Sequence, residues 1–122
     1  VNGCELWKTD GTEAGTMMVA NIDTSEALIP QLGSNPVYFC TYNNAVYFSA
    51  YRPVDGRELW KTDGTEAGTT LVRDLAPGNS SPSDLLVYNG ALYFIAYCPK
   101  EAPMVSNFYD AICSHIADSF SC

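Results

Sequence analysis

The chain has 122 residues and a mass of 13.3 kDa, which is room for about one domain of ordinary size. Apolar residues make up 47% of it, so it can build a hydrophobic core and is not expected to be disordered. Its formal charge of −8 would repel nucleic-acid phosphates and anionic lipid surfaces, and no apolar run approaches the roughly 18 residues of a membrane span. We therefore expect no nucleic-acid partner and no membrane insertion.

An extracellular location is expected from the residues that secreted proteins use. The chain opens at Val1 without an initiator Met, which indicates a processed chain or a fragment. Five cysteines are many for this length, and disulfides form in oxidising compartments. Asn79 begins the triplet Asn-Ser-Ser, an acceptor for N-linked glycans. These features predict a secreted protein that carries disulfides and is glycosylated at Asn79.

An internal repeat dominates the sequence. Residues 5–16 read ELWKTDGTEAGT, and residues 58–69 repeat all twelve letters without a difference, at an offset of 53 positions. Residues 42–51 match residues 88–97 at an offset of 46, so the first copy carries about seven extra residues within 23–36. Self-similarity of this kind is typical of repeat architectures.

Each repeat is predicted to form four short strands, because its apolar runs are rich in Val, Tyr, Phe and Leu and are separated by turn residues. The central strands are expected at 37–42, 45–51, 57–62 and 69–75. The pairs Asn43-Asn44 and Asn89-Gly90 predict type I′ hairpin turns, since Asn and Gly tolerate positive φ. The fold class is therefore all-β, with two four-stranded antiparallel repeats resembling propeller blades over residues 1–98.

The sequence resembles the ELWxxDGT repeat family of bacterial extracellular proteins. The resemblance depends on Glu5-Leu6-Trp7 with Asp10-Gly11-Thr12, and on the same six positions beginning at Glu58. It covers roughly residues 1–98. It implies a propeller-like or solenoid β-architecture and an extracellular setting, without an agreed activity.

The repeats are circularly permuted. The chain begins inside the turn before the first ELW strand, and the repeat pattern stops in the equivalent turn near Cys98. Each end therefore holds half a repeat and could complete the other. Open strand edges pair readily, so we expect the protein to associate with itself, head to tail, in a filament or a ring.

Disulfide bonds between cysteines could join the copies of such an assembly covalently. Arg52 and Arg57 flank a four-residue turn and are expected to lie opposite each other, and their equivalents at the chain ends are Cys98 and Cys4. We therefore predict a Cys4 to Cys98 bridge between neighbouring chains, the alternative being two incidental thiols. The other disulfide candidates are Cys40, Cys113 and Cys122, whose pairing the sequence leaves open. A zinc site is not expected.

The last segment, residues 99–122, departs from the repeat. Phe108, Ile112, Ile116 and Phe120 recur every four residues, which predicts a short amphipathic helix. This helix could pack on the chain's own sheet or on a neighbouring subunit.

Two features of the repeated motif have alternative interpretations. The loop carrying Asp10, Glu13, Asp63 and Glu66 is expected to be a tight turn, and a calcium loop is the alternative. Trp7 and Trp60 are expected to fill the core between repeats, and stacking platforms for sugar rings are the alternative.

The chemistry of the chain favours a structural function over catalysis. His115 is the only imidazole and lies outside the repeats, and the repeated carboxylates do not form one asymmetric pair, so no enzyme activity and no cofactor are expected apart from the calcium alternative. The sequence predicts a structural, self-assembling extracellular protein whose partner is itself. A carbohydrate-binding propeller module with glycan partners is the alternative.

Overall fold

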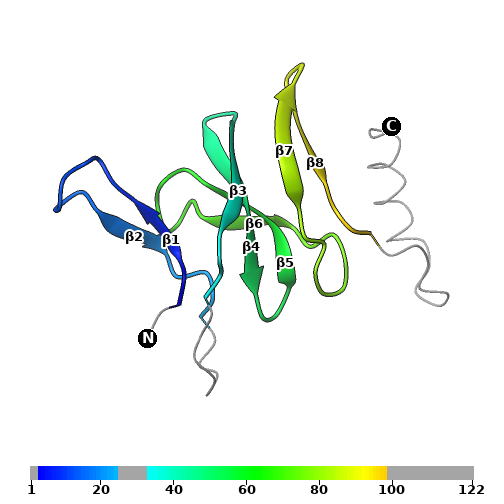
Figure 1. Ribbon diagram of the computed structural model, residues 1–122, viewed down its shortest axis with the longest axis horizontal. Coiled ribbons are helices and arrows are strands. Elements are labelled where there is room, and N and C mark those ends of the chain that lie inside the picture. The colour runs from blue at the N-terminus through cyan, green and yellow to red at the C-terminus, as the bar shows by residue number, and fades with distance from the viewer. Residues whose placement is uncertain (1–2, 25–32, 99–122) are drawn as a thin grey trace.

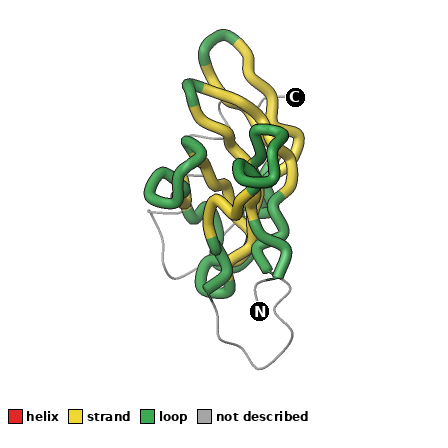
Figure 2. The backbone as a smooth tube through the Cα atoms, turned by 90° about the vertical axis from the view of Figure 1, so that its left-hand side faces the viewer, coloured by secondary structure: helices red, strands yellow, loops and turns green. Residues whose placement is uncertain are grey.

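The computed structural model describes residues 3–24 and 33–98, and the regular structure of this part is entirely β-strand. Figure 2 shows strands and loops alone in the described part of the chain. Nothing in these two ranges is a helix long and apolar enough to cross a bilayer. The eight strands are β1 Leu6–Lys8, β2 Met17–Ala20, β3 Val37–Tyr42, β4 Ala45–Arg52, β5 Gly56–Thr62, β6 Thr70–Arg73, β7 Ser83–Tyr88 and β8 Ala91–Ile95.

The strands form three antiparallel sheets. The central sheet has four strands in the order β3-β4-β5-β6, and the flanking sheets are the pairs β1-β2 and β7-β8. Figure 1 shows the three sheets following one another across the molecule, with β3 beside β7. The all-β prediction is thus confirmed, and the four strands expected between residues 37 and 75 are present with ends that differ by at most two residues.

The turns of the repeats have the backbone geometry that their residues predict. Asn43 and Asn44 have φ of 48° and 59°, and Asn89 and Gly90 have φ of 48° and 77°. Two consecutive residues with positive φ match the twist of a hairpin, which is why Asn and Gly occupy these positions. Both predicted two-residue hairpin turns are confirmed.

The repetition extends to irregularities of the strands. β3 contains a β-bulge between Val37 and Cys40, and β7 contains one between Ser83 and Leu86. At the equivalent positions inside these bulges, Tyr38 and Asp84 have φ of 59° and 53°. A residue with positive φ in a bulge bends the strand and increases its twist. The first strand of each repeat is therefore bent in the same way.

The two flanking sheets correspond to halves of the central one. By the sequence repeat, β1 and β2 are equivalent to β5 and β6, while β7 and β8 are equivalent to β3 and β4. The paired strands also share their register shift, which lies between Leu6 and Trp7 in one copy and between Leu59 and Trp60 in the other. In the described residues, β1 thus lacks a strand equivalent to β4 at its side.

A hydrophobic core joins the β1-β2 sheet to one face of the central sheet. Phe48 and Ala50 on β4 are fully buried, and Trp60 on β5 is 4% exposed. The β1-β2 sheet and the segment after it cover these side chains with Leu6, Val19, Ala20 and Ile22. This cluster is the hydrophobic core of the described chain, and it joins the β1-β2 sheet to β4 and β5 of the central sheet.

One sequence expectation about register is wrong. Strands β4 and β5 pair Arg52 with Gly56 and Tyr51 with Arg57, so Arg52 and Arg57 do not lie opposite each other. The Arg52 guanidinium instead pairs with Asp55 inside the turn and lies 4.9 Å from the centre of the Trp60 ring. The turn is one residue shorter on the β5 side than the sequence suggested, because Gly56, with φ of 86°, already belongs to the strand. The expected helix in residues 99–122, with His115, lies outside the described residues.

Replacing Phe48 with Ala should lower the free energy of unfolding by about 3–5 kcal/mol, because the change leaves a cavity in a fully buried position. Urea denaturation followed by tryptophan fluorescence measures the loss. Val54→Ala is the control, since Val54 is 79% exposed in the β4-β5 turn and its truncation should change stability by less than about 0.5 kcal/mol. Equal effects of the two variants would contradict this position of the core.

Candidate functional site

A buried carboxylate of the ELW motif anchors the loop that leads to the next repeat. Glu58 is fully buried on β5. It accepts hydrogen bonds from the backbone amides of Leu75, at 3.0 Å, and Ser80, at 2.8 Å, and from the Ser80 hydroxyl. The carbonyl of Ser80 in turn accepts from the amide of Tyr97, at 2.6 Å. Glu58 therefore connects its own strand to the opening segment of the repeat that follows.

Glu5 repeats this arrangement in the first copy. Its carboxylate accepts from the amides of Ile22 and Ser34, each at 3.0 Å, and from the Ser34 hydroxyl at 2.6 Å. The Ser34 carbonyl accepts from the Tyr51 amide at 2.7 Å. Ile22 is equivalent to Leu75 at the offset of 53, and Ser34 is equivalent to Ser80 at the offset of 46. The seven extra residues of the first copy therefore lie between Ile22 and Ser34.

The surroundings of Glu58 shift its protonation. Burial raises the pKa of this carboxyl above its ordinary value, and the hydrogen bonds from Ser80 and Leu75 offset part of that effect. The charge of Asp74 adds a smaller increase. A buried carboxylate that retains three donors is the arrangement expected where the charged group would otherwise lose its hydration.

The DGTEAGT loops are turns closed by their own side chains. In the second copy, one oxygen of Asp63 accepts from the Thr65 amide, at 2.9 Å, and from the Thr65 hydroxyl, at 2.6 Å. The Thr65 hydroxyl oxygen also accepts from the Gly68 amide, and a Cβ at Gly68 would lie 2.0 Å from the Asp63 carboxylate. Thr62 and Thr69 close the base of the loop with a hydroxyl contact of 2.8 Å. The tight-turn interpretation of this motif is confirmed.

The first copy has the same loop, built by Asp10, Thr12 and Gly15. The hydroxyl of Thr12 lowers the pKa of Asp10 and that of Thr65 lowers the pKa of Asp63, with the amides of the same threonines contributing next. Both carboxylates are fully exposed. Their pKa values are therefore set by these local donors.

The calcium alternative involves the same exposed loops. One oxygen of each aspartate is engaged by its threonine, while Glu13 and Glu66 are exposed neighbours in the loops. Within residues 3–24 and 33–98, no group of three or more His, Cys, Asp or Glu side chains is arranged to hold a metal ion. Calcium binding remains a prediction for these loops.

The two tryptophans of the identical motifs lie in different environments. Trp60 is 4% exposed in the core, whereas Trp7 is 59% exposed on β1. The core interpretation is confirmed for Trp60, and for Trp7, which is exposed in the single chain, it stays a prediction. The sugar-stacking alternative is wrong for Trp60, because a buried ring presents no face to a ligand, and it stays a prediction for Trp7.

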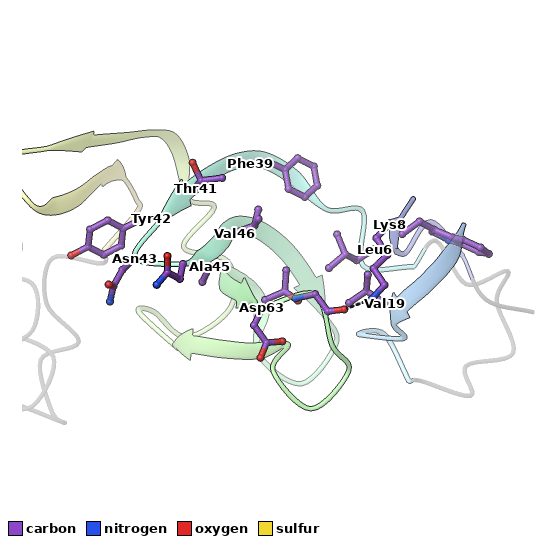
Figure 3. A pocket seen from close by; sticks show the side chains of 14 residues that line it. Leu6, Lys8, Val19, Phe39, Thr41, Tyr42, Asn43, Ala45, Val46 and Asp63 are labelled. Carbon is purple, nitrogen blue, oxygen red and sulfur yellow. Dashed lines mark hydrogen bonds between the residues drawn. The ribbon is translucent and has the colours of Figure 1, made fainter. Parts of the chain in front are cut away.

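A pocket of about 670 Å³ lies beside the exposed Trp7. Figure 3 shows Leu6, Lys8 and Val19 of the β1-β2 sheet on one side of it and Phe39 and Tyr42 of β3 on the other. Its remaining walls come from the end of β3, the β3-β4 turn, the start of β4, and the end of β5 with the loop after it. These contribute Thr41, Asn43, Asn44, Ala45, Val46, Thr62, Asp63 and Gly64. The pocket therefore lies between the β1-β2 sheet and the end of the central sheet that holds the β3-β4 turn and the end of β5.

The described cysteines differ in state. Cys98 is disulfide-bonded, while Cys4 is an exposed free thiol and Cys40 a half-buried one. Continuing the observed β4-β5 register to a strand pairing between copies would place Cys4 opposite Tyr97, and Cys98 opposite Gly3. The geometric premise of a Cys4 to Cys98 bridge is thus wrong, because adjacent strand positions point to opposite faces. Cys113 and Cys122 lie outside the described residues.

Asn79 is exposed in the loop between β6 and β7, as expected for a glycan acceptor. Its side-chain oxygen accepts a hydrogen bond from the Arg57 amide at 2.7 Å. Attachment of a glycan uses the other atom of the side-chain amide, its nitrogen. Glycosylation at Asn79 stays a prediction.

Sequence reasoning did not assign a role to the two anchoring glutamates and their serines. A signal was present, because Glu5 and Glu58 begin the identical motifs and Ser34 and Ser80 share the offset of 46. Comparison of the chain with protein-family models, with curated proteins and with solved structures found no match in any of the three.

Replacing Glu58 with Gln should lower the free energy of unfolding at neutral pH by roughly 2 kcal/mol, because an amide group would then face three donors. The variant should also change the pH profile. A carboxyl whose folded-state pKa is raised stabilises the native protein most below its unfolded pKa, near 4.5, and this contribution is lost as the pH rises through the folded-state pKa.

Urea denaturation at a series of pH values between about 4 and 7 measures both effects. The difference between wild type and Glu58→Gln should shrink as the pH rises through this window. Glu66→Gln, at an exposed loop position, is the control and should leave both stability and slope unchanged. A pH profile of Glu58→Gln parallel to that of wild type would contradict the assignment.

Proposed function

We propose that this protein is a structural, self-assembling extracellular protein whose copies join head to tail. In the joint, β1 of one copy pairs with β8 of the next and completes a four-stranded sheet of the kind formed by β3-β4-β5-β6. Continued in this way, the sheets would form a propeller-like series and a filament, or a ring if the rotation closes. The proposed function involves no catalysis.

The exposure of Trp7 is the observation that carries the proposal. Trp7 and Trp60 have identical neighbours in sequence, yet their exposed fractions are 59% and 4%. Trp60 is flanked by β4 on one side and β6 on the other, whereas the sheet of Trp7 contains only β1 and β2. Trp60 is also covered by the β1-β2 sheet, through Leu6 and Val19. In the described chain Trp7 lacks both a strand of the β4 type beside it and a cover of this kind.

Strand β8 has the sequence of such a neighbour. Residues 91–97 are equivalent to residues 45–51 of β4, and β8 lies in a two-stranded sheet with β7. In the β4-β5 pairing Phe48 lies opposite Trp60. The same register would place Phe94 of one copy opposite Trp7 of the next, an aromatic cross-strand pair of a stabilising type.

The pocket beside Trp7 supports the same arrangement, because its lining includes Leu6, Trp7 and Lys8 of β1, the strand that the joint would pair. The joint proposed here does not require the Cys4 to Cys98 bridge. A secreted setting agrees with the cysteines and the acceptor triplet at Asn79.

Replacing Trp7 with Ala should weaken assembly strongly and leave the fold of the single chain intact. Completing the burial of an aromatic ring of this exposure removes apolar surface worth about 3 kcal/mol, or roughly a hundredfold in association constant. Sedimentation velocity over a concentration series, with electron microscopy of the largest species, measures assembly. Thermal unfolding at low concentration measures the fold.

Trp60→Ala is the matched control, since it removes the equivalent ring from the core and should lower the stability of the single chain. The proposal fails if the wild-type chain stays monomeric at every concentration. It also fails if Trp7→Ala assembles as wild type does.

Carbohydrate binding is the second candidate function, and the composition of the pocket favours it. Trp7 and Tyr42 supply aromatic surface, and Asn43 and Asp63 supply polar groups at the same pocket. Such a combination suits the apolar face and the hydroxyls of a sugar. Titration of the monomer with a panel of oligosaccharides should then change the fluorescence of Trp7, and Trp7→Phe should lower that response. No response to any sugar in the panel would remove this candidate.

A further inference from the structure

A hydrogen bond joins two neighbouring repeats of the chain, and the sequence repeat indicates which residues would form the equivalent bond between two copies. Lys8 on β1 donates a hydrogen bond from Nζ to the carbonyl of Gly64, at 2.7 Å, in the DGT loop of the central sheet. This contact joins two successive repeats through one lysine and one loop carbonyl. The repeat supplies an equivalent lysine, Lys61, and an equivalent loop, which contains Gly11.

Lys61 and Gly11 do not meet within the chain. Lys61 is exposed on β5, and the described residues include no hydrogen bond or ion pair of its side chain. Gly11 is exposed in the loop after β1. If β8 of one copy pairs with β1 of the next, Lys61 of the first copy bears the same relation to Gly11 of the second as Lys8 bears to Gly64.

A second hydrogen bond between neighbouring repeats also has an equivalent pair of residues that do not meet within the chain. The Tyr42 hydroxyl donates to the carbonyl of Gly90 at 2.7 Å, where β3 lies beside β7. The equivalent residues are Tyr88, which is 69% exposed, and Asn44, which lines the pocket. In the completed joint, the Tyr88 hydroxyl of the first copy would reach the Asn44 carbonyl of the second.

The apolar surfaces agree with these two polar contacts. Val19 is 7% exposed and belongs to the same buried cluster as Trp60, whereas its equivalent Val72 is 42% exposed. The partner that Val72 lacks in the described chain is a tryptophan of the next repeat, which is Trp7 of the next copy. Arg73 is the residue equivalent to Ala20, which is buried. The long side chain of Arg73 can extend past the joint to solvent.

We propose that two latches fix the register between copies: Lys61 of one copy on the Gly11 carbonyl of the next, and Tyr88 of the first on the Asn44 carbonyl of the second. Val72 of the first copy packs against Trp7 of the second between the latches. This inference rests on the proposed self-assembly and names its contact residues. The partner is a second copy of this chain, because each latch is half of a contact that the chain already makes within itself.

Lys61→Met tests the first latch, with Lys8→Met as its matched control. Loss of one hydrogen bond at the joint should raise the concentration for half-assembly by about three- to tenfold in Lys61→Met, without a change in the melting temperature of the monomer. Lys8→Met removes the equivalent bond inside the chain, so it should lower the monomer melting temperature, which Lys61→Met should leave unchanged. Sedimentation velocity and thermal unfolding of the full chain give both readouts.

Tyr88→Phe and Tyr42→Phe form the second matched pair, since each loses only a hydroxyl. Tyr88→Phe should weaken assembly and Tyr42→Phe should destabilise the monomer. If the wild type assembles and neither Lys61→Met nor Tyr88→Phe weakens it, the latches are wrong and self-assembly stands. If the wild type does not assemble, the latches and the proposed function both fail.

Discussion

The structure depends on the buried carboxylate at the head of the ELW motif. Glu5 and Glu58 each bind two backbone amides and a serine hydroxyl, and in each case the donors belong to the segment that leaves one repeat and the loop that opens the next. Removing a carboxylate from water is costly unless its oxygens regain donors. The glutamate is therefore stable only when both segments are in place, and this requirement positions each repeat relative to the one before it.

The fold could be predicted from the sequence where local rules decide the structure. The Asn43-Asn44 turn, the strands at 37–42 and 57–62 and the closure of the DGT loop all follow from residues close together in the chain. The register at the β4-β5 turn could not, because it depends on Gly56 joining the strand rather than the turn. The roles of Ser34 and Ser80 depend on contacts between segments far apart in sequence, which turn and strand propensities do not encode.

The environments of the two tryptophans also depend on contacts between distant segments, so sequence reasoning predicted only one of them for the single chain. Identical motifs suggest identical environments, and sequence reasoning assigned Trp7 and Trp60 together to the core. Their exposures differ because Trp60 lies in a four-stranded sheet and is covered by the β1-β2 sheet, whereas the described chain supplies neither to Trp7. Identical sequence thus guarantees the local backbone, while burial depends on what lies alongside.

The bulges of β3 and β7 bear on the shape of any longer series of these repeats. Tyr38 and Asp84 take nearly the same positive φ at equivalent positions, so the bend of the first strand is a property of the repeat itself. Since a bulge adds to the local right-handed twist, the two equivalent strands are twisted further at the same position. In a stack where each element contacts only its neighbours, small rotations accumulate into a superhelix whose pitch reflects the single step. In the proposed series, the repeated bend of β3 and β7 and the register shifts of β1 and β5 would act at every repeat, so these local irregularities would contribute to curvature on a scale far larger than the repeat.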